Sequence, residues 1–252
     1  MNLVVDGLII SDIWLVIFDK DGTLMDLYRY WSQMISLRAG LICDKLGLDA
    51  SDKANLVFDM GVDEKKGKLR PKGPVGILKR EVVMQAAVDY LSSKGYKGTR
   101  DLCFTVFSDI DKSTSQDLKS LIQPIDGAGK LLTELKKNGC RIAIATTDKT
   151  NRAELAMEYL GFAGMMDMVV GADMVDNSKP APDMAELILE KLNINKANAA
   201  VVGDALTDIN MGINAGLKAS IGVLTGLSSE IQLRELTPHV AGSVAEIAVM
   251  NG

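Results

Sequence analysis

Residues 14–24 read WLVIFDKDGTL, and the rest of the fold can be worked out from this stretch. Residues 14–18 are apolar, with β-branched and aromatic side chains, which is typical of a strand buried on both faces. Asp19 and Asp21 follow where that strand ends, and Gly22 permits a tight turn. In open parallel sheets, ligand sites lie at the carboxyl ends of the strands. We therefore expect Asp19 and Asp21 to belong to a catalytic site. Taken alone, these residues fit an ordinary acidic turn equally well.

The composition fits a globular chain of one large domain or two smaller ones. Of the 252 residues, 47% are apolar and 24% are charged. The formal net charge of −5 argues against a nucleic-acid partner, because phosphate backbones attract basic surfaces. The N-terminus does not resemble a signal peptide, and no apolar run approaches the ~18 residues that cross a bilayer. We expect a cytoplasmic protein with no membrane association.

The three cysteines, Cys43, Cys103 and Cys140, are widely spaced and form no CxxC pair. We expect free thiols in a reducing compartment, with neither a zinc site nor a disulfide framework. His239 is the only histidine and lies far from every motif described below, so we expect it to have no catalytic role.

Strands and helices alternate after residue 124. We expect strands at 141–145, 168–170, 199–203 and 219–223, and helices at 127–138, 151–160, 183–192 and 243–250. A short hairpin at residues 3–10, turning at Asp6 and Gly7, is expected to decorate the sheet edge. This alternation predicts an α/β fold with a Rossmann-like, doubly wound parallel sheet.

The segment from residue 26 to residue 124 has a different pattern. Apolar residues recur at helical spacing over 27–46, and further helical patterns cover 75–92 and 99–120, with no sign of a strand ladder. A Gly/Pro/Lys-rich stretch at 67–74 is expected to be a loop. The sequence therefore predicts two domains: a core made of residues 1–25 and 125–252, and an inserted α-helical domain at 26–124.

Polar side chains follow several of the predicted core strands. They are Asp19 and Asp21 after the first, Thr146 and Thr147 after the second, Lys179 in the loop after the third, and Asp204 and Asp208 after the fourth. Parallel strands present their carboxyl ends together, so we expect these side chains at one edge of the sheet. Each of these side chains has an ordinary structural explanation when taken singly. Together they supply the acids, the cation and the hydroxyl that a catalytic site could use.

This set suits phosphoryl transfer. Asp19 can attack phosphorus to form an aspartyl-phosphate, and Asp21 can protonate the leaving oxygen and then deprotonate the attacking water. A Mg²⁺ ion would relieve the repulsion between clustered carboxylates, with Asp19, the backbone carbonyl of Asp21 and Asp204 as its ligands. Thr146 can hydrogen-bond a phosphoryl oxygen, and Lys179 can neutralise charge on the phosphate and the nucleophile.

The motifs, in this order, resemble those of the haloacid dehalogenase superfamily of aspartate-nucleophile phosphatases. Residues 19–23 match its DxDGT motif, Thr146 and Lys179 match its second and third motifs, and residues 203–208 match its fourth, GDxxxD. The resemblance covers almost the whole chain. It implies a Mg²⁺-dependent phosphatase acting on a small-molecule phosphomonoester, such as a sugar phosphate or a phosphoglycolate-like compound. Lys20 departs from the apolar residue often found between the two acids.

The insert resembles the helical cap of the branch that contains phosphoglycolate phosphatase and β-phosphoglucomutase-like proteins. In that branch the cap closes over the active site and helps to select the substrate. Arg70 lies in the 67–74 loop, where related proteins place substrate-reading residues, although a solvated basic loop is the alternative. A phosphosugar mutase and a non-enzymatic phospho-ligand-binding protein also remain open. A monomer and a homodimer both fit the sequence.

Overall fold

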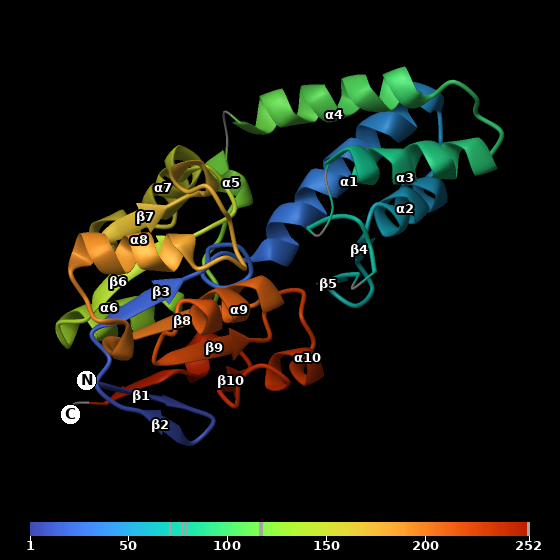
Figure 1. Ribbon diagram of the computed structural model, residues 1–252. Coiled ribbons are helices and arrows are strands. Elements are labelled where there is room, and N and C mark those ends of the chain that lie inside the picture. The colour runs from blue at the N-terminus through green and yellow to red at the C-terminus, as the bar shows by residue number, and fades with distance from the viewer. Residues whose placement is uncertain (71, 77, 79, 116–117, 251–252) are drawn as a thin grey trace. The chain divides into compact units, whose positions relative to one another are not determined.

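The computed structural model describes residues 1–70, 72–76, 78, 80–115 and 118–250. The chain divides into two compact units. Met1–Asp26 and Gln123–Gly252 form the first, which we call the α/β unit, and Leu27–Ile122 form the second, the helical unit (Figure 1). The roles of these units as a catalytic core and a cap stay predictions.

A six-stranded parallel sheet forms the centre of the α/β unit, in the order β10-β9-β8-β3-β6-β7. The strands are β3 Leu15–Phe18, β6 Arg141–Ala145, β7 Met168–Val170, β8 Ala199–Gly203, β9 Ala219–Val223 and β10 Val240–Ala241. Strand β3 comes first along the chain yet lies between β6 and β8, so the sheet is wound in both directions from its centre. This confirms the predicted α/β class and doubly wound sheet.

Helices connect these strands. They are α6 Ala128–Lys137, α7 Thr150–Tyr159, α8 Asp183–Leu192, α9 Leu206–Asn214 and α10 Glu230–Arg234. Leu15 and Ile17 of β3 belong to the same buried cluster as Met184 and Ile188 of α8. All four β3 residues are buried, which explains why the strand is apolar throughout. Trp14, expected within the strand, instead precedes it and is 54% exposed.

The predicted helix at residues 243–250 is wrong. The segment forms a 3-10 turn, Val244–Glu246, and then strand β11, Ala248–Met250. Strand β11 pairs antiparallel with β1, Asn2–Val5, which also pairs with β2, Leu8–Ile10, in a separate three-stranded sheet. The hairpin therefore does not extend the parallel sheet. Pairing of residues 248–250 with β1 prevails over the local helical pattern of this segment. A pattern within the segment cannot reveal such a distant partner.

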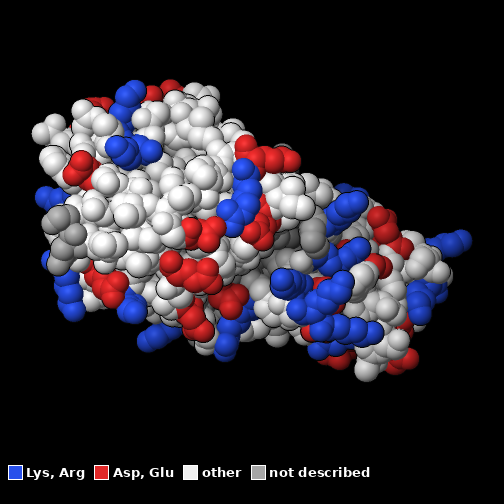
Figure 2. Space-filling model, turned by 90° about the horizontal axis from the view of Figure 1, so that it is seen from below, with Lys and Arg blue, Asp and Glu red and all other residues white. Residues whose placement is uncertain are grey.

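The helical unit contains α1 Leu27–Leu46, α2 Ala50–Asp59, α3 Arg80–Ser93, α4 Arg100–Ser115 and α5 Leu118–Leu121. It also contains an antiparallel hairpin of β4, Val62–Asp63, and β5, Lys68–Leu69, so the expectation of an insert without strands is wrong. The hairpin occupies part of the predicted 67–74 loop, in which Pro71 lies outside the described residues. Exposed basic side chains in this region are Lys65, Lys66, Lys68 and Lys72. Figure 2 shows Lys and Arg side chains gathered on this unit.

The described part of the chain contains no helix with both the length and the apolar character needed to cross a membrane. Cys43, Cys103 and Cys140 are buried free thiols, as predicted. Burial raises the pKa of Cys140 to about 12, so this thiol stays protonated near neutral pH.

Asp167 connects α6 to β6, and its removal is expected to destabilise the α/β unit. Its carboxylate accepts hydrogen bonds from Lys136 Nζ at 2.7 Å, Arg141 Nη1 at 2.7 Å and the Ile142 amide at 2.8 Å. Burial alone would raise the pKa of Asp167, but these donors bring it below its ordinary value. Asp167→Asn should therefore lower the free energy of unfolding at pH 7 by about 1–3 kcal/mol, at the smaller end because Arg141 is largely exposed.

Chemical denaturation at several pH values checks this prediction. A carboxyl group whose pKa is lowered by folding contributes stability above its unfolded pKa and loses it as the pH falls through the folded value. The difference between Asp167→Asn and the original protein should therefore shrink below pH ~4. A difference that stays constant down to pH 3 would contradict the role given to the ionised carboxylate.

Candidate active site

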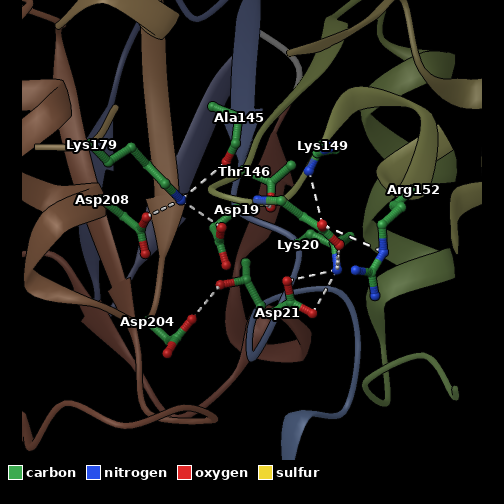
Figure 3. A network of polar contacts seen from close by, with 12 residues as sticks. Asp19, Lys20, Asp21, Ala145, Thr146, Lys149, Arg152, Lys179, Asp204 and Asp208 are labelled. Carbon is green, nitrogen blue, oxygen red and sulfur yellow. Dashed lines mark hydrogen bonds and ion pairs between the residues drawn. The ribbon is translucent and has the colours of Figure 1, made fainter. Parts of the chain in front are cut away.

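The site is built where the three central strands of the α/β unit end together. Phe18, the last residue of β3, pairs with Ile144 of β6 and with Val202 of β8. The residues that follow these strands are Asp19, Thr146 and Asp204, and all three are buried. Figure 3 shows their side chains beside one another. Parallel register thus brings together three groups that the sequence predicts to meet.

Lys179 lies at the centre of the buried polar network. Its Nζ donates to Asp19 Oδ1 at 2.6 Å, to Asp208 Oδ1 at 2.5 Å and to the carbonyl oxygen of Ala145 at 3.1 Å (Figure 3). These three acceptors match the three protons of an ammonium group. The other Asp208 oxygen accepts from the Ala205 amide at 3.0 Å, just before α9. Asp208 therefore fixes Lys179, and Lys179 fixes one oxygen of Asp19.

The electrostatics of this network follow from burial and crowding. Burial raises the pKa of Asp19 to about 7, and the negative charges of Asp208 and Asp21 add to the rise while Lys179 opposes it. Burial, with Asp19 and Asp208 nearby, also raises the pKa of Asp204 well above its ordinary value. Burial alone would lower the pKa of Lys179, but its two carboxylate partners raise it well above the ordinary value. Lys179 is therefore a permanent cation.

Asp204 is held by neutral donors. Thr23 Oγ1 donates to its Oδ1 at 3.2 Å, and the Leu227 amide donates to its Oδ2 at 3.2 Å. Two glycines leave room for this carboxylate: a Cβ on Gly22 would lie 2.7 Å from Oδ1, and one on Gly226 would overlap with Oδ2. Gly22 also has a φ of +88°, which a side chain would strain.

Sequence patterns did not point to the segment of residues 225–227, which also contributes to the site. Thr225 Oγ1 donates to the carbonyl oxygen of Gly22 at 2.5 Å, and Leu227 contacts Asp204 as described. The segment follows β9, whose carboxyl end lies at the same sheet edge as those of β3 and β8. The place of this segment after a parallel strand was the only feature of the sequence that could have indicated its role. The Thr-Gly pair itself is ordinary turn sequence.

Asp21 is bound by its neighbour. Lys20 Nζ lies 2.7 Å from Asp21 Oδ1 and 2.6 Å from Oδ2, so the ammonium contacts both oxygens. The Lys20 side chain is only 5% exposed, whereas that of Asp21 is 31% exposed. Asp21 is thus the more accessible of the two acids that follow β3.

The two threonines after β6 differ. Thr146 is fully buried, and its Oγ1 accepts from the Asp148 amide at 3.2 Å, which leaves its proton to be donated elsewhere. Thr147 is exposed. The geometry places Thr146 within the network, and a substrate contact for Thr147 stays a prediction.

Asp19, Asp204 and Asp208 form a candidate cation site. One carboxylate oxygen from each lies within 4.8 Å of the others. Hard oxygen donors of this kind suit Mg²⁺. The carboxylates of Asp19, Asp21, Asp204 and Asp208 outnumber the ammonium groups of Lys20 and Lys179 by two, which is the charge a divalent cation supplies. The residues present therefore fit such an ion, with Asp208 already engaged by Lys179 and Ala205.

Arg70 belongs to the helical unit and is bound within it. Its Nη1 donates to the Phe58 carbonyl at 2.8 Å, and its guanidinium lies 4.0 Å from the centre of the Phe58 ring. Its predicted contact with a substrate stays a prediction.

Comparison with known proteins agrees with this geometry. Residues 13–216 match the family model for haloacid dehalogenase-like hydrolases. The N-acetylmuramic acid 6-phosphate phosphatase of Pseudomonas putida is 27% identical over 205 residues, which cover 81% of this chain and 80% of that protein. The phosphoglycolate phosphatase of Psychrobacter arcticus is 30% identical over 110 residues, which cover 44% and 47%. For several of the strongest curated matches, the chain spans only about half of the relative's length.

The fold has solved counterparts. A family hydrolase from Deinococcus radiodurans, crystallised with bound phosphate and sodium, superposes with a TM-score of 0.66 at 19% identity, covering 94% of this chain and 93% of that one. A sequence identity of 19% together with this TM-score shows a common fold. The activity has to be inferred from the residues of the site itself. With the family model matched over most of the sequence and its strand-end motifs gathered around Asp19, the chain belongs to the haloacid dehalogenase-like hydrolases.

Proposed function

We propose that this protein is a Mg²⁺-dependent phosphatase that hydrolyses a small-molecule phosphomonoester through an aspartyl-phosphate on Asp19. The observation that supports this best is the buried pairing of Lys179 with both Asp19 and Asp208. Lys179 engages one oxygen of Asp19, so the second oxygen is the one to attack phosphorus. An ammonium at 2.6 Å also favours the ionised, nucleophilic form of a carboxylate that burial alone would protonate.

In the first step, the second Asp19 oxygen forms a bond to phosphorus and the bond from phosphorus to the ester oxygen breaks. Asp21 gives its proton to that leaving oxygen, which departs as an alcohol. In the second step, water attacks the phosphorus of the aspartyl-phosphate, and its proton passes to Asp21. The bond to Asp19 then breaks and inorganic phosphate is released, with both carboxyl groups restored.

Asp19, Asp204 and the backbone carbonyl of Asp21 would hold the Mg²⁺, with Asp208 orienting the site through Lys179. When bound, the ion supplies positive charge next to the phosphoryl oxygens and the crowded carboxylates. Lys179 shares this task, and the Thr146 hydroxyl donates to a phosphoryl oxygen. These groups are preorganised by the sheet, so they need no rearrangement during the reaction.

The substrate we propose is a sugar phosphate or a similarly small anionic phosphomonoester. Two curated relatives are named for such compounds, N-acetylmuramic acid 6-phosphate and phosphoglycolate. Water rather than a sugar hydroxyl is the proposed acceptor, because these relatives are named phosphatases. The helical unit is proposed to act as a cap, with its basic side chains around Arg70 attracting the anionic substrate.

Phosphate release from a panel of metabolite phosphomonoesters, measured with Mg²⁺ and with EDTA, tests this proposal. We expect release from one chemical group of esters, dependent on the metal. The organic product should be the free alcohol. If the product were a rearranged sugar phosphate and no phosphate were released, the protein would be a mutase instead of a phosphatase. Tight ligand binding without turnover would favour a binding protein.

A further inference from the structure

Among the described residues of the site, Lys20 is the buried charged one to which the proposed reaction assigns no task. Lysine is rarely buried in folded proteins unless its ammonium is paired. Here the Lys20 side chain is 5% exposed, at the end of the nucleophile's own strand. The carboxylate of Asp21, with its oxygens 2.7 Å and 2.6 Å from Nζ, is the ionic partner of this buried ammonium. A buried charge in this position calls for a specific explanation.

The local backbone holds Lys20 in place. Its carbonyl oxygen accepts from the amides of Leu24 at 3.1 Å and Met25 at 2.9 Å, so the loop after β3 folds back over it. The side chain then reaches across the sheet edge towards the loop after β6, where Asp148 Oδ2 lies 3.8 Å from Nζ. Asp148 is itself tied to the Lys149 amide at 2.8 Å and lies 3.6 Å from Arg152 Nε (Figure 3).

The two lysines of the site have separate tasks. Lys179 binds Asp19 and Asp208, while Lys20 binds Asp21 through both oxygens. The Asp21 side chain is 31% exposed, and a partly exposed aspartate can sample more than one rotamer. Two short contacts to one buried ammonium select a single orientation. An apolar residue at position 20 would fill the same space but would leave Asp21 without this constraint.

We infer that Lys20 is the positioning residue for Asp21, holding the acid/base carboxyl in the orientation from which it reaches the reacting oxygen. One Asp21 oxygen stays on Lys20 while the other turns to the leaving oxygen, and later to the attacking water. The role of Asp148 is to anchor Lys20 from the loop that follows the neighbouring strand, β6. This inference rests on the proposed function of Asp21.

The test compares Lys20→Met, which keeps an unbranched side chain only one atom shorter and removes the charge, with Lys20→Arg, which keeps the charge. p-Nitrophenyl phosphate is the probe, because its leaving group departs without a proton from Asp21. In Lys20→Met we expect a normal burst of p-nitrophenolate followed by a steady-state rate lower by about 10-fold. Because only the second step is slowed, kcat/KM should stay unchanged and KM should fall with kcat. Lys20→Arg should recover part of that rate. Asp21→Asn should show the same burst and a still lower steady state.

A double variant separates positioning from general support of the fold. If Lys20 acts through Asp21, adding Lys20→Met to Asp21→Asn should change the steady-state rate by less than about 2-fold. Multiplicative losses would overturn the inference, as would a slowed burst or a raised KM, which would place Lys20 on Asp19 or on the substrate.

Crystal structures of the original protein and of Lys20→Met, both with Mg²⁺, decide the point independently of turnover. We expect one Asp21 conformation with lysine present and a displaced or divided one with methionine. An unchanged Asp21 would overturn the inference. If the original protein hydrolyses no ester, the proposed function fails, while these structures still report on Lys20. Lys20→Leu, which is also apolar, serves if the methionine variant does not fold.

Discussion

Asp19→Asn is expected to lower kcat for phosphomonoester hydrolysis by about 10³-fold or more, because an amide cannot form the aspartyl-phosphate. Substrate binding should survive, since Thr146 and Lys179 remain. Phosphate release under saturating substrate and Mg²⁺ measures the loss. Radiolabelled phosphate should become trapped on the original protein but not on the Asp19→Asn variant. This difference would identify Asp19 as the residue that is phosphorylated.

Stability should not fall with this change. A carboxyl group whose pKa folding raises costs stability once the pH exceeds its unfolded pKa, and the pKa of Asp19 is raised to about 7. The neutral amide of the Asp19→Asn variant would carry no such cost, and Asp208 still pairs with Lys179. In EDTA at pH 8, we therefore expect a Tm equal to or above that of the original protein.

Asp12→Asn is the matched control for Asp19→Asn. It makes the same change at an exposed position whose φ of +59° asparagine tolerates. Normal turnover in Asp12→Asn and in Asp19→Asn alike would disprove the assigned nucleophile.

Gly226→Ala is expected to disrupt the proposed cation site by adding a single methyl group. The added Cβ would overlap with the Oδ2 and Cγ atoms of Asp204, so the carboxylate has to move. Displacement of a ligand by about 1 Å typically costs on the order of 10²-fold in rate. We expect losses of that size in Mg²⁺ affinity, measured by calorimetric titration, and in kcat/KM.

The control for Gly226→Ala is Gly164→Ala, since a Cβ on Gly164 would meet no atom within 4 Å. This variant should bind Mg²⁺ and turn over normally. Unaltered Mg²⁺ affinity in Gly226→Ala would show that Asp204 is not a ligand. Reduced affinity in both variants would point to a general effect on the α/β unit.

Sequence patterns predicted the centre of the α/β unit well because the information there is local. Strands β3, β6 and β8 are apolar runs that stop at a polar residue, and parallel pairing alone then gathers Asp19, Thr146 and Asp204. The fold class and the meeting of these residues at one sheet edge follow from that rule.

The contacts that the sequence did not predict depend on distant partners. Residues 248–250 form a strand because β1 is there to pair with them. Gly226 matters because Asp204 occupies the space where its side chain would be. The orientation of Lys20 depends on Asp21 beside it and on Asp148 in another loop. Periodicity and motif spacing carry no information about such side-chain geometry.

The central place of β3 in the sheet has a consequence for folding. Both of its neighbours, β6 and β8, come later in the chain, and the whole helical unit separates it from the first of them. A ribosome therefore releases β3 long before either partner strand has been synthesised. The pairings that bury it are of high contact order, which slows folding. Strand β3 is apolar and stays unpaired throughout that interval. During synthesis, the segment next to Asp19 is therefore the part of the sheet most prone to aggregation.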